Sequence, residues 1–110
     1  MVQFVIQRFF ALGQKLTSDT SPFGRGFNFH VDVLIPYTDR EQIKQAESYV
    51  DHVLAEVDHR ALGVDVKVPY DTSAEACAHL HKQIAAEIGP DVATHWRRGD
   101  GLEFEFKGKD

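Results

Sequence analysis

An alternation of apolar and polar residues between positions 27 and 33 limits the fold more than any other feature of the chain. Phenylalanines and valines there alternate with Asn28, His30 and Asp32. Successive side chains of a β-strand point to opposite faces, so this segment is predicted to be a strand with one buried face and one polar face. Residues 102–106, Leu-Glu-Phe-Glu-Phe, repeat the pattern. An apolar layer must therefore cover one face of the sheet.

Two further segments are predicted to be strands. Residues 2–10 are rich in β-branched and aromatic side chains, and residues 92–96 resemble them. Between residues 17 and 26, Ser, Thr, Gly and Pro are frequent, which is typical of a loop. The first two strands are therefore joined directly, with no helix between them.

Two helices are predicted between the second and third strands. The first begins at a Thr38-Asp39 cap and carries apolar residues at three- and four-residue steps to about His59. The second opens with a capping box, Thr72 to Glu75, and ends at Gly89-Pro90. The predicted order is β-β-α-α-β-β, without internal repeats.

Composition indicates a single domain over residues 1–110. With 43% hydrophobic and 26% charged residues, the chain has the balance of a soluble globular protein. Its net charge of −5 argues against nucleic acid or an anionic membrane as a partner. One cysteine, Cys77, excludes an internal disulfide. Without a signal-like start or a membrane-length apolar run, a cytoplasmic location is expected.

These elements predict an α+β fold, a four-stranded antiparallel sheet with both helices on one face. The other face would expose four polar residues, His30, Asp32, Glu103 and Glu105. Such a sheet also has two open edges, which proteins usually cover or blunt. Subunits joined edge to edge into a barrel with a polar lumen would resolve both problems. A monomeric two-layer sandwich is the alternative.

Five local motifs, taken in their order and spacing, resemble a known family. They are Phe10-Ala-Leu-Gly-Gln-Lys-Leu16, Arg25-Gly-Phe-Asn-Phe-His-Val31, Asp39 to Lys44, Val57-Asp-His-Arg-Ala-Leu62 and Thr72-Ser-Ala-Glu75. Together they are similar to the 6-pyruvoyl-tetrahydropterin and 6-carboxytetrahydropterin synthases, which have the tunnelling fold. The resemblance implies trimeric barrels that stack into hexamers, with pterin pockets between subunits.

The resemblance also implies a zinc ion held by three histidines, but the matching positions are Gln14, Arg25 and Phe27. Zinc needs nitrogen, sulfur or carboxylate donors, and a neutral amide, a guanidinium and a phenyl ring do not supply them. The catalytic cysteine of the family corresponds to Ser21. We therefore expect no metal or other cofactor at this position.

Asp58 and His59 match the family's proton-transfer pair, and a carboxylate beside an imidazole is suited to acid–base catalysis near neutral pH. The same two residues are also consistent with an ordinary helix end, where a histidine interacts favourably with the helix dipole. Asp51-His52, seven residues earlier, shows that the dipeptide alone is not specific.

Five further positions are candidates for substrate binding. Arg25 would place a positive charge where the metal lay, and Gln14 would stand beside it. Ser73 and Glu75 match residues near the family's pterin pocket, although a helix cap explains them equally well. The family's pterin-binding glutamate falls on His95 or Trp96, and of these His95 is the candidate. Neither side chain pairs bidentately with a guanidine-like edge as a carboxylate does.

Three hypotheses follow. The first is a zinc-independent, lyase- or cyclase-type enzyme acting on a pterin-like or other small cyclic substrate. The second is a non-catalytic homologue that binds a ligand or only assembles. The third is a metal site formed between subunits, for example by copies of His30 around a symmetry axis. A homo-oligomer, trimeric or hexameric, is expected in each case.

The substitutions at the zinc positions predict that the purified protein carries no stoichiometric zinc there. Elemental analysis of the purified protein tests this. About one zinc per chain, lost when Gln14 or Arg25 is mutated, would overturn the prediction. Zinc that survives both mutations would support the third hypothesis instead.

Overall fold

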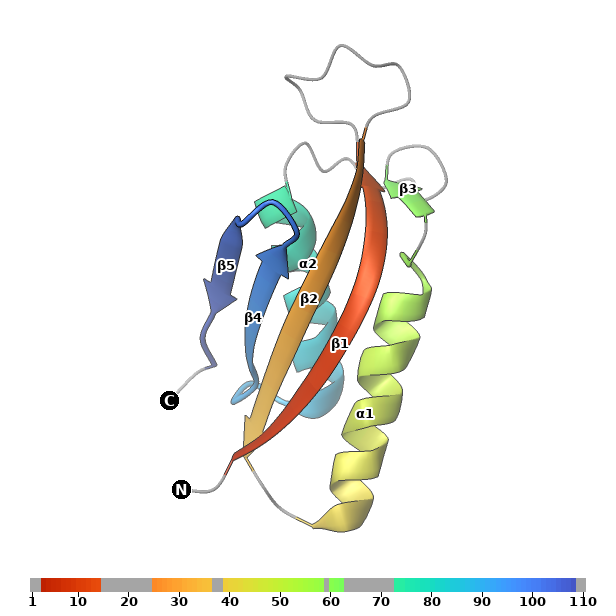
Figure 1. Ribbon diagram of the computed structural model, residues 1–110. Helices are drawn as coiled ribbons and strands as arrows, with labels where there is room; N and C mark the ends of the chain where they lie inside the picture. Colours follow the sequence, from red (N-terminus) through yellow and green to blue (C-terminus); the bar gives the residue numbers. More distant parts are fainter. Residues whose placement is uncertain (1–2, 15–24, 37–38, 59, 63–72, 109–110) are drawn as a thin grey trace.

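The computed structural model describes residues 3–14, 25–36, 39–58, 60–62 and 73–108, which form five strands and two helices in one sheet-and-helix unit. Figure 1 shows α2 behind the sheet and α1 alongside β1, and both helices contribute to one core with the same face of the sheet. In chain order the elements are β1 (Gln3–Gln14), β2 (Arg25–Pro36), α1 (Arg40–Ala55), β3 (Arg60–Leu62), α2 (Ser73–Ile88), β4 (Ala93–Arg98) and β5 (Glu103–Phe106).

The strand order across the sheet is β3-β1-β2-β4-β5. The predicted four-stranded antiparallel sheet is confirmed, with three pairings in the order β1-β2-β4-β5, and β2 is the next described element after β1. The three-residue β3 was not predicted. It runs parallel to the end of β1, with Leu12 opposite Arg60. A strand this short has too few residues to show an alternating pattern in the sequence.

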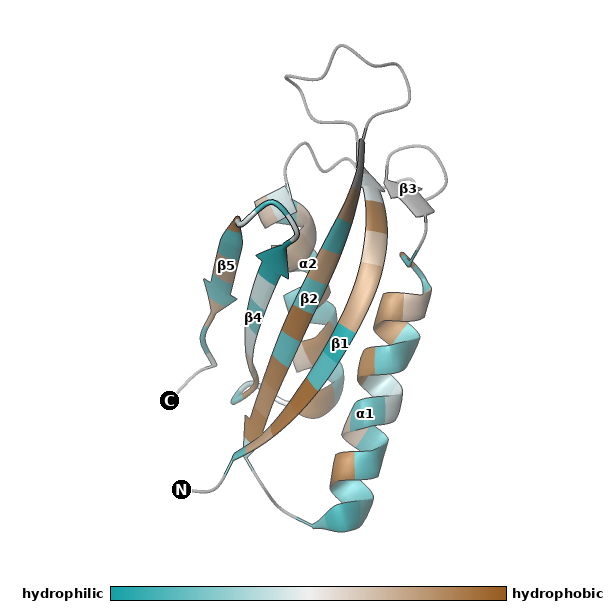
Figure 2. Ribbon diagram, in the orientation of Figure 1, coloured by the Kyte–Doolittle hydropathy of each residue, from teal (hydrophilic) through white to brown (hydrophobic). Residues whose placement is uncertain are grey.

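β1 and β2 form one long ladder in which Gln3 lies opposite Pro36 and Gln14 opposite Arg25. This register places the even-numbered residues of β1 and the odd-numbered residues of β2 on the helix side. Figure 2 shows the resulting bands of hydrophilic and hydrophobic residues along both strands. A shift of one residue would turn every apolar side chain to the opposite face, so burial of one face fixes the register.

The core lies between the sheet and the helices. Trp96, Val31 and Val33 are fully buried, and Phe10 stacks on Phe29 with ring centroids 5.2 Å apart. The helices contribute an apolar stripe each, comprising Ile43, Ala46, Val50, Val53 and Leu54 from α1 and Ala76, Cys77, Leu80 and Ile84 from α2. The prediction that the Phe27-to-Val33 face packs under the helices is confirmed, with Phe27 itself at the margin of the core.

α1 begins as predicted and ends earlier than predicted. The side chain of Asp39 accepts a hydrogen bond from the backbone N–H of Gln42, which makes Asp39 the N-cap. The helix ends at Ala55 rather than near His59, because the chain turns there to bring β3 beside β1. The predicted cap of α2, Thr72, lies outside the described residues. None of the helices seen here is long and apolar enough to cross a membrane.

Two titratable side chains are held in their neutral forms by burial between α2 and the sheet. Burial raises the pKa of the Cys77 thiol to about 12, so it is unreactive at neutral pH. Burial also lowers the pKa of His81, whose Nδ1 lies 2.8 Å from Oγ1 of Thr94. The indole N–H of Trp96 donates to that same hydroxyl at 2.7 Å. The contacts among His81, Thr94 and Trp96 hold α2 against β4 and stabilise the core.

Candidate functional site

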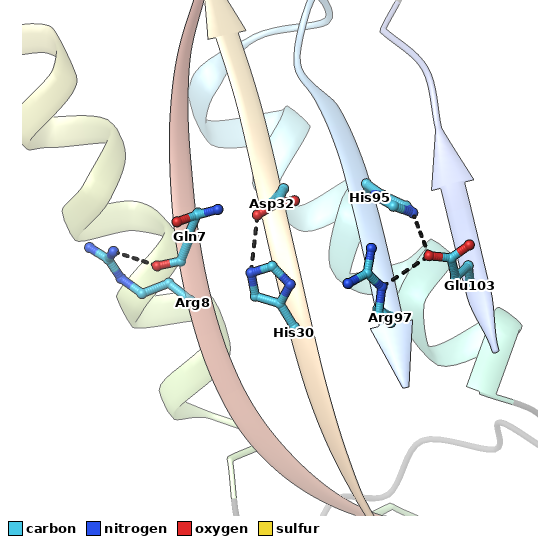
Figure 3. Close-up of polar contacts among 7 residues, drawn as sticks. All are labelled: Gln7, Arg8, His30, Asp32, His95, Arg97 and Glu103. Atoms are coloured by element: carbon cyan, nitrogen blue, oxygen red, sulfur yellow. Dashed lines mark hydrogen bonds and ion pairs between the residues drawn. The ribbon is translucent and has the colours of Figure 1, made fainter. Parts of the chain in front are cut away.

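The face of the sheet that the helices leave open carries a group of polar side chains from β2, β4 and β5 (Figure 3). The strand register puts His95 beside Asp32, and Arg97 between His30 and Glu103. Nε of Arg97 donates to Oε1 of Glu103 at 3.0 Å, and Nε2 of His95 lies 3.6 Å from the same oxygen. The open face is therefore a network of charges and imidazoles rather than a set of isolated polar residues.

Asp32 is the most enclosed acid of this open face. Its Oδ1 lies 3.1 Å from Nε2 of His30, within ion-pair distance, but the contact lacks the orientation of a hydrogen bond. This oxygen is buried and has no hydrogen-bond partner among the residues that the structure describes. Buried acceptors are normally satisfied by protein or water. The face therefore has acceptor capacity that the described part of one chain does not use.

Asp58 lies at the opposite edge of the sheet, after the end of α1. Its Oδ1 accepts a hydrogen bond of 2.8 Å from the backbone N–H of Ala11. Ala11 immediately precedes the residues of β1 that pair with β3, so the carboxylate extends the hydrogen bonding of that edge by one position. Asp58 thus has a clear structural role in joining the end of α1 to β1.

A hollow of about 430 Å³ adjoins this carboxylate, within the size range of small-molecule sites. It is lined by Phe9, Phe10, Ala11, Asn28, Phe29 and Asp58. Phe10 and Phe29 pair across the ladder and their rings are buried on the helix side, whereas the ring of Phe9 is exposed on the opposite face. The hollow contains Asp58, a residue of the predicted site.

Ser73 and Arg98 meet on the helix side of the sheet. Ser73 is the first residue of α2 and is buried, and its hydroxyl accepts a hydrogen bond of 2.9 Å from Nη1 of Arg98. The other nitrogens of Arg98 donate to both carboxylate oxygens of Asp100, at 2.7 and 2.6 Å. This two-point pairing lowers the pKa of Asp100. Arg98 is only 8% exposed, and the exposed carboxylate of Asp100 balances its charge.

The guanidinium of Arg98 also lies 4.2 Å from the ring centroid of Phe27, a cation–π contact. Phe27 occupies one of the positions at which the resemblance implies a zinc histidine. Its ring has no donor, and its neighbour is an arginine rather than a metal ligand. The zinc of the family therefore does not fit this position, and the described residues contain no group of three or more His, Cys, Asp or Glu side chains able to hold a metal.

The other candidate residues that the structure describes lie on different elements. Gln14 and Arg25 pair at the far end of the β1–β2 ladder, and their side chains are outside the described set. His59 is also outside it. Glu75 is exposed in the first turn of α2. His95 lies on the open face, while Trp96, the alternative at that position, is fully buried in the core.

Among the candidates that the structure describes, Asp58, Ser73 and His95 do not form one site within a chain. His95 is level with Gln7, whereas Asp58 is bonded at Ala11, four residues further along β1 and two strands away. Strand geometry makes that separation roughly 16 Å. Ser73 lies on the opposite side of the sheet from His95. Gln14 is three residues, or about 10 Å, from the strand position that Asp58 contacts.

Sequence analysis missed Arg98 and Phe9. Arg98 lies beyond the strand predicted over residues 92–96, but it follows Thr94 and Trp96 at steps of two and therefore points inward with them. Phe9 alternates with Val5 and Gln7, which puts it on the open face. The alternation of side chains along each strand indicates the face on which both residues lie. It becomes informative only once the bounds of the strands are known.

The chain has the tunnelling fold, an antiparallel sheet with two helices inserted between its second and third long strands. Its fold is similar to that of the 6-pyruvoyl tetrahydropterin synthase of Caenorhabditis elegans, with a TM-score of 0.78 and 19% sequence identity. The similarity covers 98% of this chain and 96% of that one. No protein-family model matches the chain, and no curated protein is similar to it in sequence.

The buried position of Arg98 predicts that lysine cannot replace it. Arg98→Lys loses the two-point pairing with Asp100 and the bond to Ser73, so the free energy of unfolding should fall by about 1.5–3 kcal/mol. Arg97→Lys is the matched control, because Arg97 is exposed and makes one ion pair, and it should change stability by less than about 0.5 kcal/mol. Urea denaturation of both variants measures the difference. Equal effects would show that the buried pairing contributes little.

Proposed function

We propose that this protein is a homo-oligomeric, zinc-independent relative of the 6-pyruvoyl-tetrahydropterin synthases that binds a pterin-like or other small heterocycle between subunits. The observation that carries the proposal is the separation of the candidate residues within one chain. Asp58, His95 and Ser73 lie on three different parts of the subunit. A site that uses more than one of them must be completed by a neighbouring chain.

The sheet edges support assembly. β3 pairs only with Leu12 to Gln14, so most of that edge of β1 has no strand partner among the residues described here. β5 forms the other edge and pairs with β4 alone. Unpaired edges favour the addition of another strand, and repeated head-to-tail addition closes into a ring. In such a ring the open face, with its His30, Asp32 and Glu103 network, would line a polar lumen.

The two versions of the proposal differ in chemistry. In the catalytic version, Asp58 and His59 move protons in a lyase- or cyclase-type reaction, and Arg25 stabilises a developing anion. In the non-catalytic version, the pocket only binds, and Asp58 serves the structural bond to Ala11 that the subunit already contains. The substitutions at Gln14, Arg25 and Phe27 favour neither version alone, because they remove only the family's metal.

The proposed assembly predicts a native mass of three or six 12.4 kDa chains at micromolar concentration. Native mass spectrometry of protein purified from its own host measures the mass, and bound heterocycles would appear as a discrete mass increment. A monomer would refute the shared pocket. A ring without any increment would favour an assembly role over ligand binding.

The catalytic version predicts that His59→Ala lowers the turnover of the identified ligand by roughly 10²–10⁴-fold, because a general base is lost. His52→Ala is the matched control. His52 also follows an aspartate, but it is exposed on α1 and lies 3.5 Å from Glu56, so its removal should leave the rate unchanged. An unaltered rate in a well-folded His59→Ala variant would leave only the non-catalytic version.

A further inference from the structure

Phe9 is unusual because a large aromatic side chain stands exposed on a polar sheet face. Its side chain is 79% exposed, against 44% for Val5 and 47% for Leu102, the other large apolar side chains exposed in the described segments. Apolar surface left in water forgoes the free energy that burial would give. The exposed ring is therefore available for contact with a ligand.

The ring is held in place from one side. It stacks on the imidazole of His30 with centroids 4.7 Å apart and planes 25° from parallel. His30 is in turn positioned by Asp32, 3.1 Å away, as Figure 3 shows. The pair therefore presents a fixed aromatic surface on the open face. A preorganised surface of this kind loses little conformational entropy when a ligand packs on it.

The ring also borders the hollow beside Asp58. The polar part of that lining is the amide of Asn28 and the carboxylate of Asp58, and Phe9 is the exposed aromatic side chain among the lining residues. An accessible aromatic ring with a few polar groups nearby is a common feature of small-molecule sites. Aromatic rings pack on flat π systems in stacked arrangements. The hollow therefore suits a flat ring with polar groups at its edge.

The surroundings favour a small ligand over a protein. The neighbours of Phe9 on this face are the polar residues Gln7, His30 and Arg97. Val5 is separated from Phe9 by Gln7 on the same strand. Protein interfaces have a broad apolar centre, which a single ring does not provide. A second chain added at the β1 edge would extend the sheet beside Phe9 and leave the ring's outer surface free.

We propose that Phe9, stacked on His30, is the surface on which a flat heteroaromatic ligand packs as it occupies the hollow beside Asn28 and Asp58. The inference rests on the proposed function and adds to it the residue that recognises the ligand's ring. Phe9 is a binding residue in this proposal and takes no part in proton transfer.

Titration of the intact protein with pterin and with guanosine, followed by ligand fluorescence and by calorimetry, tests the inference. Phe9→Leu keeps an apolar side chain and loses the π surface, so it should weaken binding at least about fivefold, as should Phe9→Ala. Phe9→Trp should bind as tightly as the natural protein or more tightly. Val5→Ala, a change on the same strand and face, should not alter binding.

The possible results distinguish a failure of the proposed function from a failure of the role assigned to Phe9. If the natural protein binds neither probe at millimolar concentration, the proposed function fails and the inference fails with it. If it binds a probe and Phe9→Leu binds equally well, the inference alone is wrong. If Phe9→Leu and Phe9→Ala instead dissociate the oligomer, as judged by light scattering, a second chain covers the ring and the ligand surface is excluded.

Discussion

The fold depends on the central strand β2, which is paired on both sides and carries opposite chemistry on its two faces. Phe29, Val31 and Val33 are buried beneath the helices, while His30 and Asp32 lie on the open face. Because β2 pairs with β1 along its whole length and with β4 from Phe29 to Leu34, its register also sets the register of both neighbours. Every side chain of the candidate site on the sheet is positioned by that choice.

The same constraint leaves the subunit with features that one chain does not use. One face of the sheet is covered by helices, and the other is polar, with a buried oxygen of Asp32 that lacks a hydrogen-bond partner in the described part of the chain. The edges of the sheet are short or open. A polar open face and unpaired edges are typical of a subunit that assembles with other chains, and they support the proposal that the binding site lies between chains.

The region that would hold zinc in the synthase family is organised around an arginine. Arg98 brings together the start of α2, the turn before β5 and the ring of Phe27 through Ser73, Asp100 and a cation–π contact. A buried guanidinium is tolerated because each of its bonds is matched by an acceptor of suitable geometry. The charge in this region is thus provided by the chain itself and is fixed in place. Phe27 has no donor atom with which to bind a metal ion that could act as a Lewis acid.

The sequence by itself determined the alternation of β2 and β5, the apolar stripes of both helices and the cap at Asp39, because each is a local pattern that one element contains. It therefore predicted the order β-β-α-α-β-β and the face that packs. Only the tertiary structure decided what depends on distant segments meeting. The pairing of β3 with β1, the bond from Ala11 to Asp58 across 47 positions and the burial of Arg98 against Ser73 belong to this class. The physical reason is that a single strand or helix fixes the direction of its side chains, whereas their partners are fixed by the packing of elements far apart in the chain.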